Sequence, residues 1–268
     1  RAAREGAGDA REAQVSPRRP VRAWIGKPHL DPAELAGPGG LTEDVLRGEG
    51  DAEGQEPEGD DAFWESLLTP QRLARIEAVL SARLRSVTVV LDRLLDAHNV
   101  AAVLRTAEGL GLSRVHVVPH DARDDAAHRR VTQDAHKWLD VTTHASGAQA
   151  ARALAAEGFA VYAGHLDARA RPYTEIAADG AVALLFGNEH EGPSAETLAA
   201  CAGTFRIPMA GFTQSFNVSV AAGIALSQIC AGRRAFLGAA GDLPPEERRA
   251  LRSRFLRLAA KLARRVKR

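Results

Sequence analysis

The spacing of apolar residues predicts where regular structure begins in this chain. Large apolar side chains become frequent from Phe63 onward, and Thr69 followed by Pro70 is typical of a helix start, where a hydroxyl caps the first turn. Three- and four-residue intervals then place four apolar side chains on one helical face: Leu73, Ile76, Leu80 and Leu84. We therefore predict an amphipathic helix at the start of the folded part.

After this helix, short apolar runs alternate with helical patterns. The run SVTVVLD is β-branched and continuous, which is typical of a strand that is buried on both faces of a parallel sheet. Further strands are predicted at residues 114–118, 137–144, 160–165, 181–188 and 204–208. Helices are predicted between them at residues 99–111, 148–158 and 194–200, with one more long helix after residue 217. This alternation predicts an α/β fold with a mainly parallel sheet flanked by helices.

Charge is distributed unevenly along the chain, although the net charge is only +1. Residues 43–61 hold nine acids and one arginine, whereas the last 21 residues carry ten Lys or Arg and no acid. We interpret residues 1–62 as a mostly disordered acidic extension, 63–240 as the folded domain, and 241–268 as a basic amphipathic helix. A basic helix suits a partner that bears phosphates, and the alternative is a solvated surface.

Composition and motif content narrow the class of protein. The 268 residues contain no run of eighteen apolar residues, so we expect no membrane span, and the first residues have no apolar core of a signal peptide. Cys201 and Cys230 are the only cysteines, which favours a reduced, cytoplasmic protein. The sequence has no dinucleotide fingerprint, Walker loop, nucleophile elbow or metal-ligand motif, so we predict no metal. Scattered histidines are interpreted as structural or exposed: His116, His120, His128, His136 and His144.

Three polar segments follow predicted strands, which is where α/β proteins place their sites. They are DAHNVAAVLRT, LLFGNEHEGP and RIPMAGFTQSFNVSVAAG. Each has a simpler interpretation when taken alone: an exposed arginine, an ordinary loop, and a helix N-cap. Capping does not explain the polar residues of the third segment together. The candidate site residues are Asn99, Arg105, Glu189, Ser215 and Asn217.

Together, HNVAAVLRT, FGNEHEG and IPMAGFTQSFNVSVAAG resemble motifs one, two and three of the SpoU family. These proteins are S-adenosylmethionine-dependent RNA ribose 2′-O-methyltransferases of the SPOUT superfamily. The resemblance spans roughly residues 67–236 and is greater to the TrmH branch, which methylates guanosine 18 in the D-loop of tRNA. Two departures stand out: LLDAH replaces a sequence often similar to VHKPH, and Phe216 replaces a more usual leucine.

The resemblance implies a deep trefoil knot in the C-terminal part of the domain, a rare exception to unknotted topology. S-adenosylmethionine would bind bent against the knot loops, as methyl donor. Its adenine and ribose would rest on the backbone near Leu166, Gly187, Ile207, Met209 and Phe216.

The resemblance also implies roles for the polar residues. Arg105 would clamp a phosphate and stabilise alkoxide charge, because a guanidinium stays protonated in proteins and cannot act as a base. Asn99 and Glu189 would hold Arg105 and the ribose in register, and Ser215 with Asn217 would orient the substrate. RNA contacts are expected from His98, Arg233, Arg234 and Arg254. The implied partners are tRNA and a second copy of the chain, as a homodimer.

Other functions remain compatible with these residues. A 23S rRNA guanosine 2′-O-methyltransferase is the nearest, but such enzymes typically carry a folded N-terminal RNA-binding domain, and residues 1–62 lack that pattern. A knotted RNA-binding protein without catalysis would not need the complete polar set. An α/β nucleotide-binding protein unrelated to RNA would leave the basic C-terminal helix unexplained.

Overall fold

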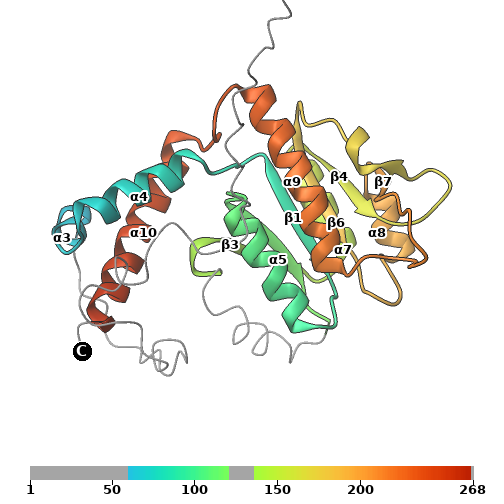
Figure 1. Cartoon of the computed structure of the whole chain (residues 1–268), viewed down its shortest axis with the longest axis horizontal. Helices are drawn as coiled ribbons and strands as arrows, with labels where there is room; N and C mark the ends of the chain where they lie inside the picture. Colours follow the sequence, from blue (N-terminus) through green and yellow to red (C-terminus); the bar gives the residue numbers. More distant parts are fainter. Residues whose placement is uncertain (1–59, 121–135, 267–268) are drawn as a thin grey trace, which may run out of the picture. The chain divides into compact units, whose positions relative to one another are not determined.

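The computed structural model describes residues 60–120 and 136–266 of the chain (Figure 1). Its strands are β1 (Val87–Asp92), β2 (Arg114–Val118), β3 (Asp140–Thr143), β4 (Phe159–Gly164), β5 (Arg171–Pro172), β6 (Ala181–Phe186) and β7 (Gly203–Arg206). Its longer helices are α4 (Pro70–Ser81), α5 (Ala97–Gly109), α7 (Gly147–Ala156), α9 (Val218–Leu237) and α10 (Pro245–Val266). Shorter helices are α3 (Asp61–Ser66), η1 (His136–Trp138), η2 (Tyr173–Glu175) and α8 (Ala195–Ala200).

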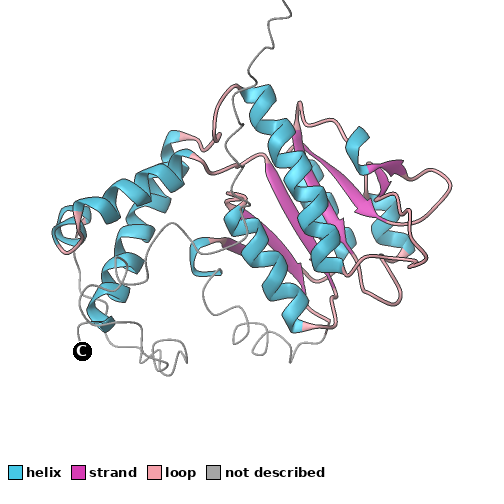
Figure 2. Ribbon diagram, in the orientation of Figure 1, coloured by secondary structure: helices cyan, strands magenta, loops and turns pink. Residues whose placement is uncertain are grey.

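The seven strands form one sheet in the order β3-β2-β1-β6-β4-β7-β5, and every neighbouring pair is parallel. Helices flank this sheet, as Figure 2 shows. The predicted α/β architecture with a parallel sheet is therefore confirmed. Late strands are inserted among early ones, because β6 lies between β1 and β4, and β7 lies on the other side of β4.

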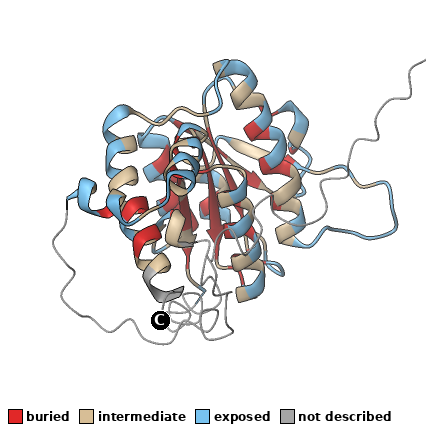
Figure 3. Cartoon of the chain, turned by 60° about the vertical axis from the view of Figure 1, so that its left-hand side comes forward, coloured by how far each residue is buried: buried red, intermediate tan, exposed pale blue. Residues whose placement is uncertain are grey.

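The two faces of the sheet form separate cores. Val89 and Leu91 of β1 pack with α5 and α9, whereas Val90 packs with the alanines of α7 on the opposite face. β6 alternates in the same way, since Leu184 belongs to the first core and Leu185 to the second. All six residues of β1 are buried, as the continuous apolar run predicted. Figure 3 shows buried residues along the central strands of the sheet.

A third core joins the first and last helices of the described chain. α10 packs against α3 and α4, and the buried side chains are Trp64, Ile76, Leu80, Phe255, Leu256, Ala259 and Ala260. The predicted cap of α4 is present, because Thr69 Oγ1 accepts a hydrogen bond from Arg72 N at 3.2 Å. The apolar stripe of the basic helix therefore has a packing partner within the same chain.

The structure corrects three sequence-based boundaries and adds one strand. α4 ends at Ser81, so Leu84 pairs with Leu112 beside the sheet and joins the main core instead of the helical face. Regular structure begins in α3 at residue 61, earlier than predicted, while the predicted disorder of residues 1–59 lies outside the described residues. β3 begins at Asp140 because η1 precedes it. β5, of two residues, was not predicted.

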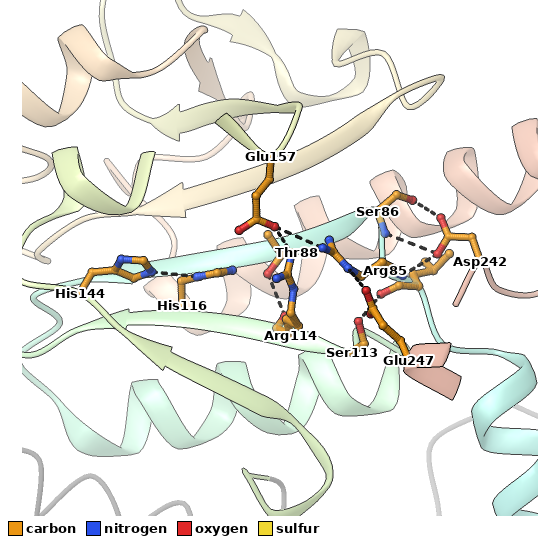
Figure 4. Close-up of polar contacts among 11 residues, drawn as sticks. Arg85, Ser86, Thr88, Ser113, Arg114, His116, His144, Glu157, Asp242 and Glu247 are labelled. Carbon is orange, nitrogen blue, oxygen red and sulfur yellow. Dashed lines mark hydrogen bonds and ion pairs between the residues drawn. The ribbon is translucent and has the colours of Figure 1, made fainter. Parts of the chain in front are cut away.

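A polar network lies at the amino ends of β1, β2 and β4 and fixes the link between α9 and α10 (Figure 4). Ser86 Oγ donates to Asp242, and Arg85 Nε lies 3.0 Å from Glu247 Oε1. Glu157 Oε2 accepts from Arg85 at 3.2 Å and from Arg114 at 2.6 Å, so two arginines share one carboxylate. Hydrogen bonds to these arginines are the largest influence on the Glu157 carboxyl and lower its pKa, although partial burial opposes them.

Within the two described ranges, 60–120 and 136–266, no helix is both long enough and apolar enough to cross a membrane.

Candidate active site

Three of the predicted site residues, Asn99, Glu189 and Asn217, gather at the carboxyl ends of the parallel strands. Asn99 lies in the first turn of α5, which follows β1, and Glu189 lies in the loop after β6, the neighbour of β1. Asn217 caps α9, the helix that follows β7. Because carboxyl ends of parallel strands meet at one edge of a sheet, this fold brings three distant segments together.

A chain of hydrogen bonds connects these three segments. Asn217 Nδ2 donates to Asn99 Oδ1 at 3.0 Å, and Asn99 Nδ2 donates to Glu189 Oε1 at 3.0 Å. The other carboxylate oxygen of Glu189 accepts from Leu95 N at 2.9 Å. Partial burial raises the pKa of the Glu189 carboxyl, but the N–H groups of Leu95 and Asn99 outweigh it and the pKa is lowered. Glu189 is therefore an ionised anchor whose two oxygens are both engaged.

Asn217 has a second role that fixes the orientation of its amide. Asn217 Oδ1 accepts from Ser219 N at 2.8 Å and from Ser219 Oγ at 2.6 Å. Two donors on Oδ1 require the Nδ2 group to point away, toward Asn99. The start of α9 and the start of α5 are thus connected through one side chain.

Asn188 precedes Glu189 and holds the loop after β6 in place. The sequence did not indicate it as a site residue. It is 5% exposed, its Nδ2 donates to Arg93 O at 3.0 Å, and its Oδ1 accepts from the N–H groups of His190 and Glu191 at 2.9 and 3.1 Å. Arg93 has a φ of 58°, a left-handed conformation that is uncommon for residues other than glycine. Asn188 therefore fixes the turn after β1 to the loop after β6.

The hydrogen-bond chain does not include Arg105 or Ser215. Arg105 is exposed on α5, and no side-chain hydrogen bond or ion pair joins it to another part of the described chain. It lies six residues after Asn99, so a helix turns its side chain away from the asparagine and toward the face of His98. The His98 side chain is 87% exposed. Ser215 is exposed in the loop before α9.

The five residues expected to hold the methyl donor follow three adjacent strands. Leu166 follows β4, Gly187 follows β6, and Ile207 follows β7, in a sheet where β6, β4 and β7 are neighbours. Leu166 and Phe216 expose apolar side chains, while Ile207 and Met209 are half-buried. An apolar surface at the strand ends fits an adenosine group that carries no phosphate.

The glycine at the end of β6 has a structural reason that differs from the expected one. A Cβ atom on Gly187 would lie 2.4 Å from Pro193 N, so the loop that contains Glu189 closes against this backbone. Gly187 is needed for the loop to fold back, independently of any ligand that approaches it.

The arginines expected to contact RNA are engaged within the protein. Arg233 donates to Ser86 Oγ at 2.7 Å, and Arg234 donates to three backbone carbonyl oxygens. Arg254 donates to two more, including that of Leu139 at 2.6 Å, and burial lowers its pKa. These contacts connect α9 and α10 to the rest of the fold and occupy part of each guanidinium, and an RNA role for these three residues stays a prediction.

Two of the scattered histidines form a pair that the sequence did not indicate. His116 Nδ1 lies 2.9 Å from His144 Nε2 (Figure 4). His116 is buried and belongs to β2, which lies between β1 and β3 in the sheet. Burial is the main cause that lowers the pKa of His116 to about 4, and His144 and Arg114 add to it. The pairing is not visible in the sequence because it depends on strand register. Among the described residues, no group of three or more His, Cys, Asp or Glu could hold a metal ion.

A parallel sheet with polar groups gathered at one carboxyl edge defines an α/β protein whose site is at its strand ends. Residues 86–227, more than half of the chain, match the model of the SpoU rRNA Methylase family, and the chain belongs to this family. It is 38% identical over 158 residues to a tRNA (guanosine(18)-2'-O)-methyltransferase of Thermus thermophilus, covering 59% of this chain and 81% of that protein.

Two further comparisons bear on the fold and on the substrate. A crystal structure of the A. aeolicus TrmH/SpoU tRNA modifying enzyme superposes with a TM-score of 0.63 at 26% identity, covering 69% of this chain and 95% of that chain. A 23S rRNA (guanosine-2'-O-)-methyltransferase RlmB of Burkholderia sp is 39% identical over 140 residues, covering 52% of this chain and 56% of that protein.

Proposed function

We propose that this chain transfers a methyl group from S-adenosylmethionine to the ribose 2′-hydroxyl of guanosine 18 in the D-loop of tRNA. The observation that carries the proposal is the hydrogen-bond chain from Asn217 through Asn99 to Glu189, which connects the three segments that resemble the family motifs. The names of relatives such as the T. thermophilus enzyme support guanosine 18 as the target.

The bound donor supplies an activated, cationic methyl group, so the residues of this chain act mainly by orienting and by stabilising charge. Leu166, Ile207, Met209 and Phe216 would hold its adenosine part at the ends of β4 and β7. Glu189 is ionised and engaged at both oxygens, so it positions Asn99 and is not free to remove a proton. Asn99 and Asn217 in turn fix the helix starts that flank the acceptor ribose.

Arg105 is the group available for the acceptor. Its guanidinium is exposed and is not engaged by another described side chain, and it offers five N–H donors. It can therefore bind the phosphate next to the target ribose and stabilise the negative charge that develops on the 2′-oxygen as the methyl group is transferred and the hydroxyl proton passes to solvent water. Ser215 would orient the ribose from the loop before α9.

The proposal extends to assembly and location. We propose that the C-terminal part forms a deep trefoil knot, because α9 returns to pack on α5 and β1 after β7 has been added beyond β4. We also propose a homodimer that shares a tRNA-binding surface, and a cytoplasmic location, where tRNA would be met.

A 23S rRNA substrate is the second candidate, and the extent of the matches favours tRNA. The chain covers 81% of the T. thermophilus tRNA enzyme but 56% of the Burkholderia RlmB protein, although the identities are similar. Almost half of the RlmB protein lies outside its match to this chain.

The test is incubation of the purified full chain with radiolabelled S-adenosylmethionine and separate pools of unmodified tRNA and 23S rRNA. The product would be mapped by nuclease digestion and mass spectrometry. Ribose-methylated guanosine in the tRNA D-loop is the expected result. Label only in rRNA would keep the family and overturn the substrate, and no label with the donor bound would favour an RNA-binding role without catalysis.

A further inference from the structure

One aromatic side chain beside the site has no hydrogen-bonding, aromatic or cationic partner among the described residues. Phe212 is fully exposed, at 109% of its reference area, and is the most exposed large apolar residue of the described chain. It lies in the loop between β7 and α9, three residues before Ser215. All residues from Ala210 to Asn217 are exposed, so the ring extends from a segment that the core does not cover.

We propose that Phe212 stacks on the base of the nucleotide whose ribose is methylated. This inference rests on the proposed RNA substrate. Proteins that read unpaired nucleotides stack the bases on aromatic side chains, because every base offers a π-face. A single nucleotide then has three contacts at this edge of the sheet: Arg105 for the phosphate, the Ser215–Asn217 segment for the ribose, and Phe212 for the base.

The loop itself separates the base from the methyl donor. Ile207 packs partly against the main core and Met209 is half-buried, so the beginning of the loop faces the fold, where the donor is expected. Phe216, at the end of the loop, is 39% exposed. Phe212 lies between these positions along the chain and is directed outward, which is the side from which an RNA must approach.

The loop is also free to adjust to a polynucleotide. From Ile207 to Phe216, no hydrogen bond joins the loop to another part of the described chain. A Cβ atom on Gly211, the residue before Phe212, would meet only the Thr213 hydroxyl at 4.0 Å, so the loop is open at this position. An aromatic residue on such a loop can follow a base into place.

The chain offers a matched control for this ring. Phe236 is also exposed, at 63%, but it lies in the last turn of α9, while Phe212 precedes the first turn. A 20-residue helix is about 30 Å long, so the two rings are far from each other along it. Arg233 lies over the Phe236 ring at 5.5 Å, whereas no cation covers Phe212 among the described residues.

The first measurement is the tryptophan fluorescence of the full-length variants F212W and F236W. The emission of the wild-type chain is subtracted from each, because the wild type itself has three tryptophans. The probe is an unmodified D-loop RNA hairpin, without methyl donor. Stacking should quench and saturate the emission of F212W and leave F236W unchanged. Equal responses of the two variants, or none in F212W while the RNA binds, would overturn the inference.

Two controls exclude other partners of the ring. A shift of F212W emission with S-adenosylmethionine alone would place the ring on the donor, and a shift with protein concentration alone would place it in an interface between copies. Either result would overturn base stacking. Quenching does not require methyl transfer, so loss of the proposed activity and loss of stacking can be distinguished.

Kinetics supply the second test. F212A should lower kcat/KM for tRNA by roughly 5- to 100-fold, the equivalent of one lost base stack, while KM for S-adenosylmethionine stays unchanged. F212Y retains the aromatic face and should restore most of the activity, and F236A should match the wild type. An unaltered kcat/KM in F212A would contradict the role.

Discussion

Asn217 Nδ2 donates to Asn99 Oδ1 at 3.0 Å, although 118 residues separate the two asparagines in the chain. The same Asn217 caps α9, and the same Asn99 donates to Glu189. Neither amide can therefore be altered without a change at the start of α5 or α9. The site depends on the orientation of two amides whose segments meet only in the folded sheet.

Replacement of Asn99 by Asp tests this dependence with almost no change in volume. In N99D a carboxylate oxygen would face Glu189 Oε1, where the N–H group now donates at 3.0 Å, so the two negative charges should separate. We expect the methyl-transfer rate to fall about 100-fold, as for a displacement of about 1 Å in a positioned group. N217D is the matched variant, because it keeps an acceptor for Ser219 N and loses the donor to Asn99. Wild-type rates in both variants would show that the amide chain is dispensable.

Arg105 should affect catalysis without affecting stability. It has no ion-pair partner in the described structure, so R105A removes no contact that holds the fold. We expect the rate to fall roughly 100- to 1000-fold, the typical effect of removing one donor to a developing negative charge, with little change in tRNA affinity or melting temperature. R152A removes another exposed arginine, on α7, and should retain activity. Full activity in R105A would remove the proposed role of the guanidinium.

The sequence predicted most of the sheet because β1 and β6 are continuous, mostly apolar runs of six residues, which is the length of a strand and too short for a typical buried helix. It did not predict β5, since two residues at a sheet edge show no periodicity. Spacing alone also assigned Leu84 to the helix, although α4 ends at Ser81 and the side chain packs beside the sheet. Helical spacing alone does not show where a helix ends, because an apolar residue three or four positions after the last helical one can belong to the next element.

The site was predicted as a set of residues but not as an arrangement. The motif resemblance indicated Asn99, Glu189 and Asn217, but the order of their contacts follows from the insertion of β6 beside β1, which no local pattern shows. Asn188 was overlooked, because a buried asparagine in a loop has the same sequence appearance as an exposed one. The sequence shows the positive charge of the arginines of α9 and α10. It does not show the backbone carbonyl oxygens that accept hydrogen bonds from Arg234 in the folded chain.

The basic helix α10 contains two kinds of arginine, and salt dependence should distinguish them. Arg249 and Arg257 are exposed and have no ion-pair partner among the described residues, whereas Arg248 and Arg252 pair with Glu77 at 2.9 and 2.6 Å. If α10 binds RNA through its free cations, R249Q/R257Q should reduce the slope of log K against log salt by about 1 for each residue, with an unchanged melting temperature.

The paired arginines provide the control for this experiment. R248Q/R252Q removes the same number of charges but breaks contacts with α4, so we expect a loss of stability of up to about 1 kcal/mol and a nearly unchanged salt slope. Filter binding at several salt concentrations, together with thermal unfolding, measures both quantities. If neither pair alters the slope, α10 is a packing element and RNA binds elsewhere.

The His116–His144 pair should make the fold sensitive to acid. Burial is the main cause that lowers the pKa of His116 from 6.5 to about 4, and the pKa of His144 is lowered too, chiefly by burial. Between pH 6.5 and pH 4 the unfolded chain binds a proton at His116 that the folded chain does not. The free energy of unfolding therefore falls as the pH falls from 6.5 toward 4. The full effect of His116 is about 3 kcal/mol, present as stability above pH 6.5 and lost below pH 4.

Urea unfolding between pH 7.5 and 4 measures the slope of the free energy of unfolding against pH. A loss of stability that is the same at every pH, as from a change in packing, leaves this slope unchanged. H116N cannot take up the proton and should lose most of the slope. H98N, which replaces a histidine whose side chain is 87% exposed, is the control for the substitution itself. A wild-type slope in H116N would assign the acid sensitivity to other groups. The buried carboxyl of Asp92 is not one of them, because burial raises its pKa. Protonation of Asp92 therefore stabilises the folded chain as the pH falls, which is the opposite effect.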